Sequence, residues 1–304
     1  MMHLNSKFGK QTLPVIIKCR FFDNLKMVRN KIAYCIPLCL LLANSVLCAQ
    51  ASKPDYSLFE KNIYTNGKQK LRYRILWPET MEEGEKYPLF IFLHGMGLGG
   101  KDNKKQLKRG AELFLTPENR TKYPCIVLYP QAPLGKSFVK ITKNGRPLLF
   151  RGFRKFTKEK PDSEKLEMSL SPYGKMVHEV ISQLITENVV DTSRIYIGGA
   201  SMGAFCTFQL ISEYPIFAAA ASMAGGADPT TLDNWAGKVP VWIVHGNKDP
   251  IVPVESSRAV VKQLEERGIT NYRYNEYGNL KHHCWDKAFV EPDYLEWFFS
   301  KCRE

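Results

Sequence analysis

Between residue 60 and the C-terminus, short apolar runs alternate with longer stretches that have an amphipathic pattern. The apolar runs have the length and composition of β-strands and predict strands at 71–77, 87–94, 124–130, 194–199, 217–225, 239–246 and 271–277. The intervening stretches predict helices at 104–115, 171–187, 202–213, 255–267 and 291–302. Strands that alternate with helices are typical of βαβ units. The pattern therefore predicts an α/β fold with a mostly parallel central sheet and helices on both faces.

Two segments stand out from this alternation. The segment DTSRIYIGGASMG has almost no polar residue inside its strand, as expected for a central strand that is covered on both faces. Residues 134–165 instead form a long connection that holds nine Lys and Arg residues between Lys136 and Lys160 against a single acid, Glu159. Connections of this length are usually functional or disordered. This basic insertion can be a lid that steers an anionic substrate or a solvated hairpin.

The N-terminal segment differs from the rest of the chain. A basic stretch, KMVRNK, precedes the apolar run at 32–47, and small residues follow in an A-x-A arrangement. This is the pattern of a secretory signal peptide, and its apolar run is shorter than a membrane span usually needs. We expect residues 1–51 to be a signal peptide, with an N-terminal membrane anchor as the alternative. A start at Met27 would give a signal peptide of ordinary length, so residues 1–26 can be an over-extended start.

Composition and charge narrow the class of protein. Of the 304 residues, 44% are hydrophobic and 24% are charged, which is ordinary for a globular protein. Without residues 1–51 the formal charge falls from +13 to +7, and the remaining charge is scattered, which argues against a nucleic-acid partner. The predicted mature chain, 52–304, is expected to be one secreted or periplasmic domain without stable membrane insertion.

Four cysteines remain in the predicted mature chain. Oxidising compartments favour disulfides, and four cysteines allow three pairings. No C-x-x-C pair occurs among them, so they are not spaced as metal ligands. Buried free thiols remain an alternative for these residues, which are Cys125, Cys206, Cys284 and Cys302.

The pentapeptide Gly199-Ala200-Ser201-Met202-Gly203 joins a predicted buried strand to a predicted helix. This strand–turn–helix setting is that of a nucleophile elbow, in which a serine hydroxyl is exposed above the sheet. The backbone N–H of Met202 would then point at a developing oxyanion. The alternative is a tight turn in which Ser201 caps the helix. A second oxyanion donor is expected from the glycine-rich loop after the strand at 87–94, and we assign it to the N–H of Met96.

A serine nucleophile needs an imidazole base and a carboxylate that orients the base. In this fold the order along the chain is Ser, then Asp or Glu, then His. Asp249 lies in the loop after the strongly apolar strand at 239–246, where the acid is expected, although it can also be a turn residue before Pro250. Asp228 and Asp233 are weaker candidates. Two histidines at strand ends, His94 and His245, and a third inside a helix, His178, are expected to be structural.

Five segments together resemble the α/β-hydrolase esterases of the polyhydroxybutyrate-depolymerase, feruloyl-esterase and predicted secreted peptidase group: FLHGMGLGGKDNKKQL, PCIVLYPQAP, DTSRIYIGGASMGAF, VWIVHGNKDPIVP and HHCWDKAF. The similarity covers residues 60–303 in the family's order. The family's catalytic histidine stands three residues before a tryptophan, which implies that His282 is the base and Trp285 its marker. The adjacent His283 is then expected to face outward or to cap the next helix.

The resemblance implies a secreted serine hydrolase that cleaves carboxylic esters, acyl or feruloyl esters on plant polysaccharides, and that needs neither a metal nor an organic cofactor. Its alternatives are a serine peptidase for short peptides and a non-catalytic carbohydrate-binding protein on a hydrolase fold. The chain departs from the family at Leu98 and Gly99, where a Glu-Arg pair is usual, and in the length of the basic insertion. Because Cys206 and Cys284 follow Ser201 and His282 closely, a disulfide between them is conceivable.

Overall fold

The structure is a computed structural model that describes residues 53–143, 146–147 and 166–304. The predicted signal peptide, residues 1–51, lies outside the described residues. The basic insertion at 134–165 lies partly outside them, because 144–145 and 148–165 are not described. Both predictions therefore remain expectations from the sequence.

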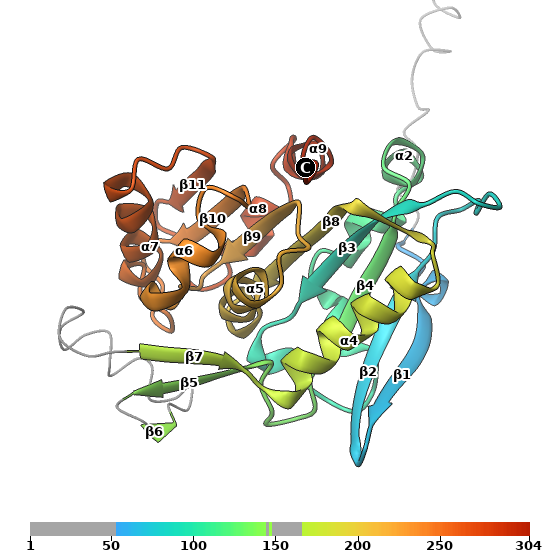
Figure 1. The fold of residues 1–304 in the computed structure, drawn as a ribbon, viewed down its shortest axis with the longest axis horizontal. Coiled ribbons are helices and arrows are strands. Elements are labelled where there is room, and N and C mark those ends of the chain that lie inside the picture. The colour runs from blue at the N-terminus through green and yellow to red at the C-terminus, as the bar shows by residue number, and fades with distance from the viewer. Residues whose placement is uncertain (1–52, 144–145, 148–165) are drawn as a thin grey trace, which may run out of the picture. The chain divides into compact units, whose positions relative to one another are not determined.

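The described chain is built around an eight-stranded sheet with the order β1-β2-β4-β3-β8-β9-β10-β11 (Figure 1). Strands β1 and β2 form an antiparallel hairpin, and β2 also runs antiparallel to β4. All other neighbours are parallel. The strands are Glu60–Asn66 (β1), Gln69–Leu76 (β2), Tyr87–Leu93 (β3), Ile126–Gln131 (β4), Val190–Ala200 (β8), Ala219–Met223 (β9), Val241–Gly246 (β10) and Tyr272–Tyr277 (β11).

Helices cover both faces of the sheet, so the alternating side chains of its central strands are buried on either face. In β3, Leu89 and Ile91 belong to one hydrophobic cluster, and Phe90 and Phe92 belong to the other. Helices α4 to α7 cover the first face. The second face is covered by α8, α9 and two 3-10 helices, Lys105–Lys108 (η3) and Ala111–Leu115 (η4). The α-helices are Pro117–Lys122 (α2), Pro172–Thr186 (α4), Met202–Glu213 (α5), Leu232–Trp235 (α6), Glu255–Glu266 (α7), Trp285–Ala288 (α8) and Tyr294–Phe299 (α9).

This strand order, with helices on both faces of a mostly parallel sheet, confirms the predicted α/β-hydrolase fold. The described chain contains all seven predicted strands within a few residues of their expected bounds. It also contains β1, which the sequence pattern missed because five of its seven residues are exposed and no clear alternation marks a buried face.

One predicted helix is wrong and another is too long. Residues 104–115 form two 3-10 helices, Lys105–Lys108 (η3) and Ala111–Leu115 (η4), instead of one α-helix. Between them Gly110 adopts a left-handed conformation with φ of 72°, and a Cβ there would lie 2.7 Å from the Phe289 ring. The left-handed backbone of Gly110 ends the helical path, and the Phe289 ring leaves no room for a Cβ at this position. The helix expected at 291–302 covers only Tyr294–Phe299.

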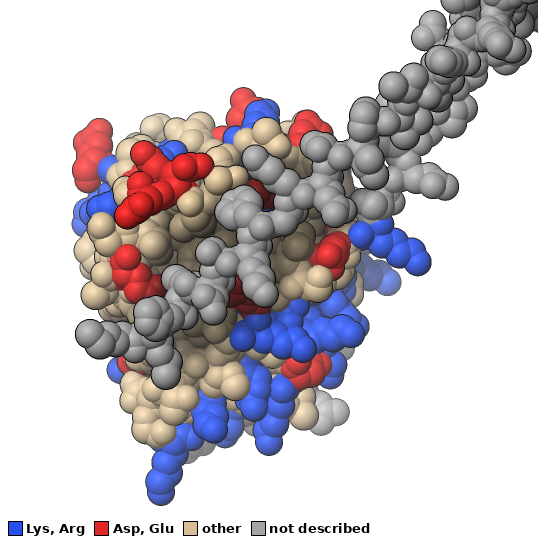
Figure 2. Space-filling view, turned by 90° about the vertical axis from the view of Figure 1, so that its right-hand side faces the viewer, with Lys and Arg blue, Asp and Glu red and all other residues tan. Residues whose placement is uncertain are grey.

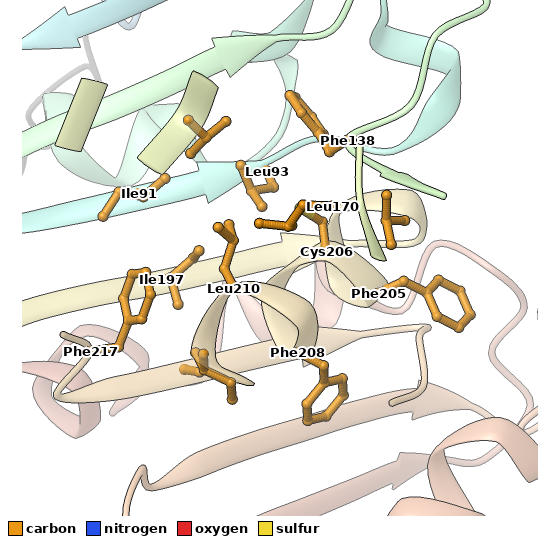
Figure 3. Close-up of a cluster of buried hydrophobic side chains, with 14 of the residues drawn as sticks. Ile91, Leu93, Phe138, Leu170, Ile197, Phe205, Cys206, Phe208, Leu210 and Phe217 are labelled. Atoms are coloured by element: carbon orange, nitrogen blue, oxygen red, sulfur yellow. The ribbon is translucent and has the colours of Figure 1, made fainter. Parts of the chain in front are cut away.

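The described part of the basic insertion and the segment that directly follows it form a small antiparallel sheet with the order β6-β5-β7. Its strands are Val139–Lys143 (β5), Arg146–Pro147 (β6) and Leu166–Leu170 (β7). Figure 3 shows Phe138 and Leu170 beside Leu93 and Cys206, so this sheet packs on α5 and the end of β3. The Asp228 carboxylate also accepts a hydrogen bond of 2.8 Å from the backbone N–H of Met168. The insertion is therefore anchored next to the start of α5.

The four cysteines of the predicted mature chain are free thiols, and the conceivable bridge between Cys206 and Cys284 does not form. Both residues are fully buried, and burial raises the pKa of each thiol, to about 12 for Cys284. They pack as small apolar residues in separate hydrophobic clusters on the two faces of the sheet.

The surface carries charges of both signs. On the face drawn in Figure 2, Lys and Arg side chains gather in the lower half, and Asp and Glu side chains lie among and above them. Within the described ranges, none of the helices has the length and apolar character needed to cross a membrane.

Candidate active site

Ser201 stands in the sharp turn between β8 and α5. Its backbone has φ of 54° and ψ of −116°, a combination that costs energy for a residue other than glycine. Two flanking glycines make the turn fit: a Cβ on Gly203 would overlap the backbone of Leu93, and a Cβ on Gly199 would overlap the backbone of Gly203. The N–H of Ser201 donates to the Met223 carbonyl at 2.8 Å. The geometry is that of a nucleophile elbow.

His282 lies between the serine and a carboxylate. Its Nε2 is 2.9 Å from Ser201 Oγ, and its Nδ1 is 2.6 Å from Asp249 Oδ2. His282 is 8% exposed, and Ser201 is 5% exposed. Because a carboxylate only accepts hydrogen bonds, Nδ1 carries the proton and Nε2 is free to accept one from the serine hydroxyl. The structure thus brings together the three residues that the sequence and the family resemblance singled out.

Asp249 is fixed by the turn that follows β10. Its Oδ1 accepts the N–H groups of Ile251 at 2.8 Å and Val252 at 3.0 Å, which leaves Oδ2 for the histidine. Burial alone would raise the pKa of Asp249, but hydrogen bonds from His245 and His282 outweigh burial and hold it below the usual range. The carboxyl is therefore ionised whenever the fold is intact near neutral pH. Asp249 is also the turn residue expected before Pro250, because its Oδ1 binds the N–H groups of the turn while its Oδ2 binds His282.

The loops after β10 and β11 are fastened to each other, and this places His282 beside Asp249. The N–H of Lys248 donates to the Leu280 carbonyl at 2.9 Å, and the N–H of Asn279 donates to Asn247 Oδ1 at 2.8 Å. Gly246 allows the close approach, because a Cβ there would overlap the carbonyl of Lys281. Since β10 and β11 are parallel neighbours, their carboxyl ends meet at the same edge of the sheet.

The loop after β3 passes next to the nucleophile. A Cβ on Gly95 would lie 3.4 Å from Ser201 Cβ, so the backbone of Gly95 and Met96 runs alongside the serine. Met202 is the first residue of α5, and the N–H groups of the first turn have no partner within the helix. Met96 and Met202 therefore both lie beside the serine, which keeps their N–H groups as candidates for an oxyanion hole.

His94 holds the loop after β3 and is fully buried. Its Nε2 accepts the backbone N–H of Ala132 at 3.0 Å, so its proton is on Nδ1, which donates to the Gly95 carbonyl at 2.6 Å. Burial lowers the pKa of His94 to about 4, against the opposing effect of the bond to Gly95. Because the C=O and N–H of a trans peptide point in opposite directions, this bond turns the N–H of Met96 away from His94. The structural role expected for His94 is confirmed.

The remaining sequence candidates lie outside this constellation. Asp228 caps the short helix Pro229–Thr231 and anchors β7, and Asp233 is exposed and pairs with Arg267 at 3.0 Å. His178 stacks on Tyr214 with ring centroids 3.5 Å apart. His283 is exposed, as expected for the outward-facing member of the pair.

Trp285 packs edge-on against His282, with ring centroids 5.1 Å apart. It is 5% exposed and opens α8, so it supports the imidazole from the side of the second hydrophobic cluster. Sequence reasoning missed one residue of the site, His245, which is buried with its Nε2 3.3 Å from Asp249 Oδ2. Its position four residues before Asp249 was the signal that could have shown it.

The site places a nucleophile, a base and a carboxylate in one line of hydrogen bonds. Such a line can remove the proton of the serine hydroxyl as the oxygen attacks a carbonyl carbon. In the part of the chain that the structure describes, no three His, Cys, Asp or Glu side chains are grouped so that they could hold a metal ion.

Comparisons with known proteins show which family and which folds this chain resembles. Residues 80–292 match the model of the phospholipase/carboxylesterase family. A thermostable esterase of known structure is 32% identical, with a TM-score of 0.68 over 81% of this chain and 64% of that one. A bifunctional acetylxylan esterase/xylanase of Neocallimastix patriciarum is 26% identical over 117 residues, 36% of this chain and 17% of that protein. A mutant feruloyl esterase module from Clostridium thermocellum, complexed with sinapinate, shares the fold at 13% identity, with a TM-score of 0.51 over 83% and 92% of the two chains.

Proposed function

Because this chain belongs to the phospholipase/carboxylesterase family, we propose that it is a serine hydrolase that cleaves carboxylic esters through Ser201, His282 and Asp249. The observation that carries the proposal is the continuous line from Ser201 Oγ to His282 Nε2 at 2.9 Å and from His282 Nδ1 to Asp249 Oδ2 at 2.6 Å. The strained backbone of Ser201 supports it, since such strain persists at functional sites.

In the first half of the proposed reaction, Ser201 Oγ attacks the ester carbonyl carbon while His282 Nε2 takes the hydroxyl proton. Asp249 holds the Nδ1–H of His282 and stabilises the imidazolium that forms. The N–H groups of Met96 and Met202 donate to the negatively charged oxygen of the tetrahedral intermediate. The intermediate then expels the alcohol, whose oxygen receives the proton from His282 Nε2, and Ser201 is left acylated.

In the second half, a water molecule gives a proton to His282 Nε2 as its oxygen attacks the acyl carbon. Collapse of this intermediate releases the carboxylic acid and returns the proton to Ser201 Oγ. No proton is gained or lost by the three side chains over the cycle, so the residues alone can turn over.

For the substrate, we propose acyl or feruloyl esters on plant polysaccharides that meet a secreted or periplasmic enzyme. The support is the 26% identity over 117 residues to an acetylxylan esterase/xylanase, of which this chain spans only 17%, and the signal-peptide pattern of residues 1–51. The likeness to the feruloyl esterase module supports the fold alone.

The test is a panel of p-nitrophenyl esters, methyl ferulate, acetylated xylan and dipeptide anilides. We expect ester turnover that Ser201→Ala and His282→Ala reduce by about four orders of magnitude or more, because each removes a member of a unit that acts together. His283→Ala is the matched control, and it should retain most of the activity because its imidazole is exposed and takes no part in the line of hydrogen bonds from Ser201 to Asp249.

The outcomes separate the alternatives. Turnover of the anilides in preference to every ester would favour the serine peptidase. Polysaccharide binding without serine-dependent turnover of any compound would favour the non-catalytic carbohydrate-binding protein. Loss of activity in His283→Ala with retention in His282→Ala would contradict the assignment of the base.

A further inference from the structure

His245 is a second imidazole in contact with Asp249, although the reaction steps above do not use it. It is the fifth residue of β10 and is fully buried. Its Nε2 lies 2.9 Å from the Val252 carbonyl and 3.3 Å from Asp249 Oδ2, and its Nδ1 lies 2.7 Å from Ser257 Oγ. Asp249 Oδ2 therefore faces two imidazole nitrogens, one from each histidine.

The partners of His245 determine where its proton stands. A backbone carbonyl only accepts hydrogen bonds, so the contact with Val252 requires a proton on Nε2. On the other side of the ring, Ser257 Oγ lies 3.0 Å from the Gly225 carbonyl. Ser257 donates either to His245 Nδ1 or to Gly225, and in the second case Nδ1 is protonated as well. Under either arrangement the Nε2–H is present and is shared between Val252 and Asp249.

We infer that His245 is a positioning residue that holds the Asp249 carboxylate by a second N–H and thereby limits how strongly this carboxylate stabilises protonated His282. The inference rests on the proposed function. It concerns the acid limb of the pH–rate profile, which is the low-pH side where the rate of reaction at Ser201 falls. A carboxylate oxygen that receives two N–H donors shares its charge between them. If one donor is removed, more of that charge acts on the other, and the protonated form of His282 becomes more stable.

The other charged and titratable groups near His245 are bound to partners of their own or are neutral. Its register partner on β11 is Glu276, which Arg258 of α7 binds at 2.6 and 2.9 Å. The Arg258 bond is the main cause that lowers the pKa of Glu276, and Tyr274 donates to the same carboxylate. Burial raises the pKa of Cys284 to about 12, so this thiol is neutral. Among the described residues around His245, this leaves Asp249 as the carboxylate that its Nε2 contacts.

The experiment compares His245→Leu, which removes both nitrogens, with His245→Gln, whose amide N–H can take the place of Nε2–H. The measured quantity is the rate at which a fluorophosphonate labels Ser201, followed as a function of pH, because this rate needs no knowledge of the natural substrate. We expect His245→Leu to move the acid limb to higher pH by about one unit, the effect of losing one charge-assisted hydrogen bond. His245→Gln should restore the wild-type position. His178→Leu, a histidine replaced on α4 outside the site, is the matched control and should leave the limb in place.

An acid limb that stays in place in His245→Leu, or that moves to lower pH, would overturn the inference, even if the overall rate falls. A purely structural role predicts that fall without movement of the limb. If the wild-type protein takes up no label, the proposed function fails instead. The inference is then decided by the NMR titration of the His282 imidazole in wild type and His245→Leu, where the midpoint should still move upward.

Discussion

The histidine that holds the loop after β3 should make the stability of the fold depend on pH. His94 is fully buried, and burial lowers its pKa from 6.5 to about 4. In the unfolded chain the imidazole takes up a proton below its ordinary pKa, whereas in the folded protein it stays neutral until about pH 4. The unfolded state therefore binds more protons in this window, and the free energy of unfolding decreases as the pH falls.

The magnitude follows from the difference between the two pKa values. One pKa unit corresponds to ~1.4 kcal/mol, so His94 contributes roughly 3 kcal/mol when fully neutral, and about 2 kcal/mol of this is lost by about pH 5. The perturbation is His94→Gln, which removes the titrating group. The free energy of unfolding is measured by urea denaturation with tryptophan fluorescence at a series of pH values. The difference between wild type and His94→Gln should shrink by about 2 kcal/mol between about pH 7.5 and about pH 5.

Ile91→Val is the control for this experiment. It shortens a core side chain of β3, the strand that leads to His94, and costs about 1 kcal/mol. The cost should be equal at every pH, because the substitution removes no titratable group. A constant difference between wild type and His94→Gln across the pH range would refute the reasoning. A histidine resonance that titrates near pH 4 in the wild-type NMR spectrum would support it independently of the variant.

Two further predictions concern packing next to the site. Gly203→Ala should lower the free energy of unfolding by about 2 kcal/mol or more, because its Cβ would overlap the Leu93 backbone, whereas Gly97→Ala meets no atom within 4 Å and should leave urea denaturation unchanged. Phe138→Ala should cost about 3–5 kcal/mol, since this fully buried ring joins the inserted sheet to the core. Leu134→Ala, at a side chain that is 76% exposed, should cost little, and equal losses in the two variants would contradict the anchoring of the insertion.

The parts of the site that the sequence predicted are those that local constraints determine. The turn around Ser201 needs glycines at 199 and 203, because a Cβ at either position would overlap neighbouring backbone. The pentapeptide in its strand–helix context is therefore enough to predict the turn and its serine. Asp249 followed from its place after a buried strand. His282 is predicted through the family resemblance, since no local rule distinguishes it from His283. The loop that carries His282 is held by contacts from the loop after β10.

The failures of sequence reasoning have a common physical cause, which is packing between residues far apart in the chain. The predicted helix at 104–115 is interrupted at Gly110, where the Phe289 ring excludes a Cβ, and Phe289 lies on a different element. His245 reads as a packing residue along β10, and its contact with Asp249 depends on how the following turn folds back over the strand end. Neither contact leaves a periodic signal in the sequence.

The order of the site residues along the chain has a consequence for folding. Ser201 and His282 are separated by 81 residues, and the loop that carries His282 follows β11, the edge strand of the sheet. Contacts of this separation require the closure of a long loop, which costs conformational entropy before any contact repays it. The central pair β3 and β8 joins residues that are further apart still, such as Phe92 and Gly198. Ser201 and His282 therefore meet only when the centre of the sheet and its β11 edge are both in place, so recovery of activity during refolding reports completed assembly of the sheet rather than the first collapse of the chain.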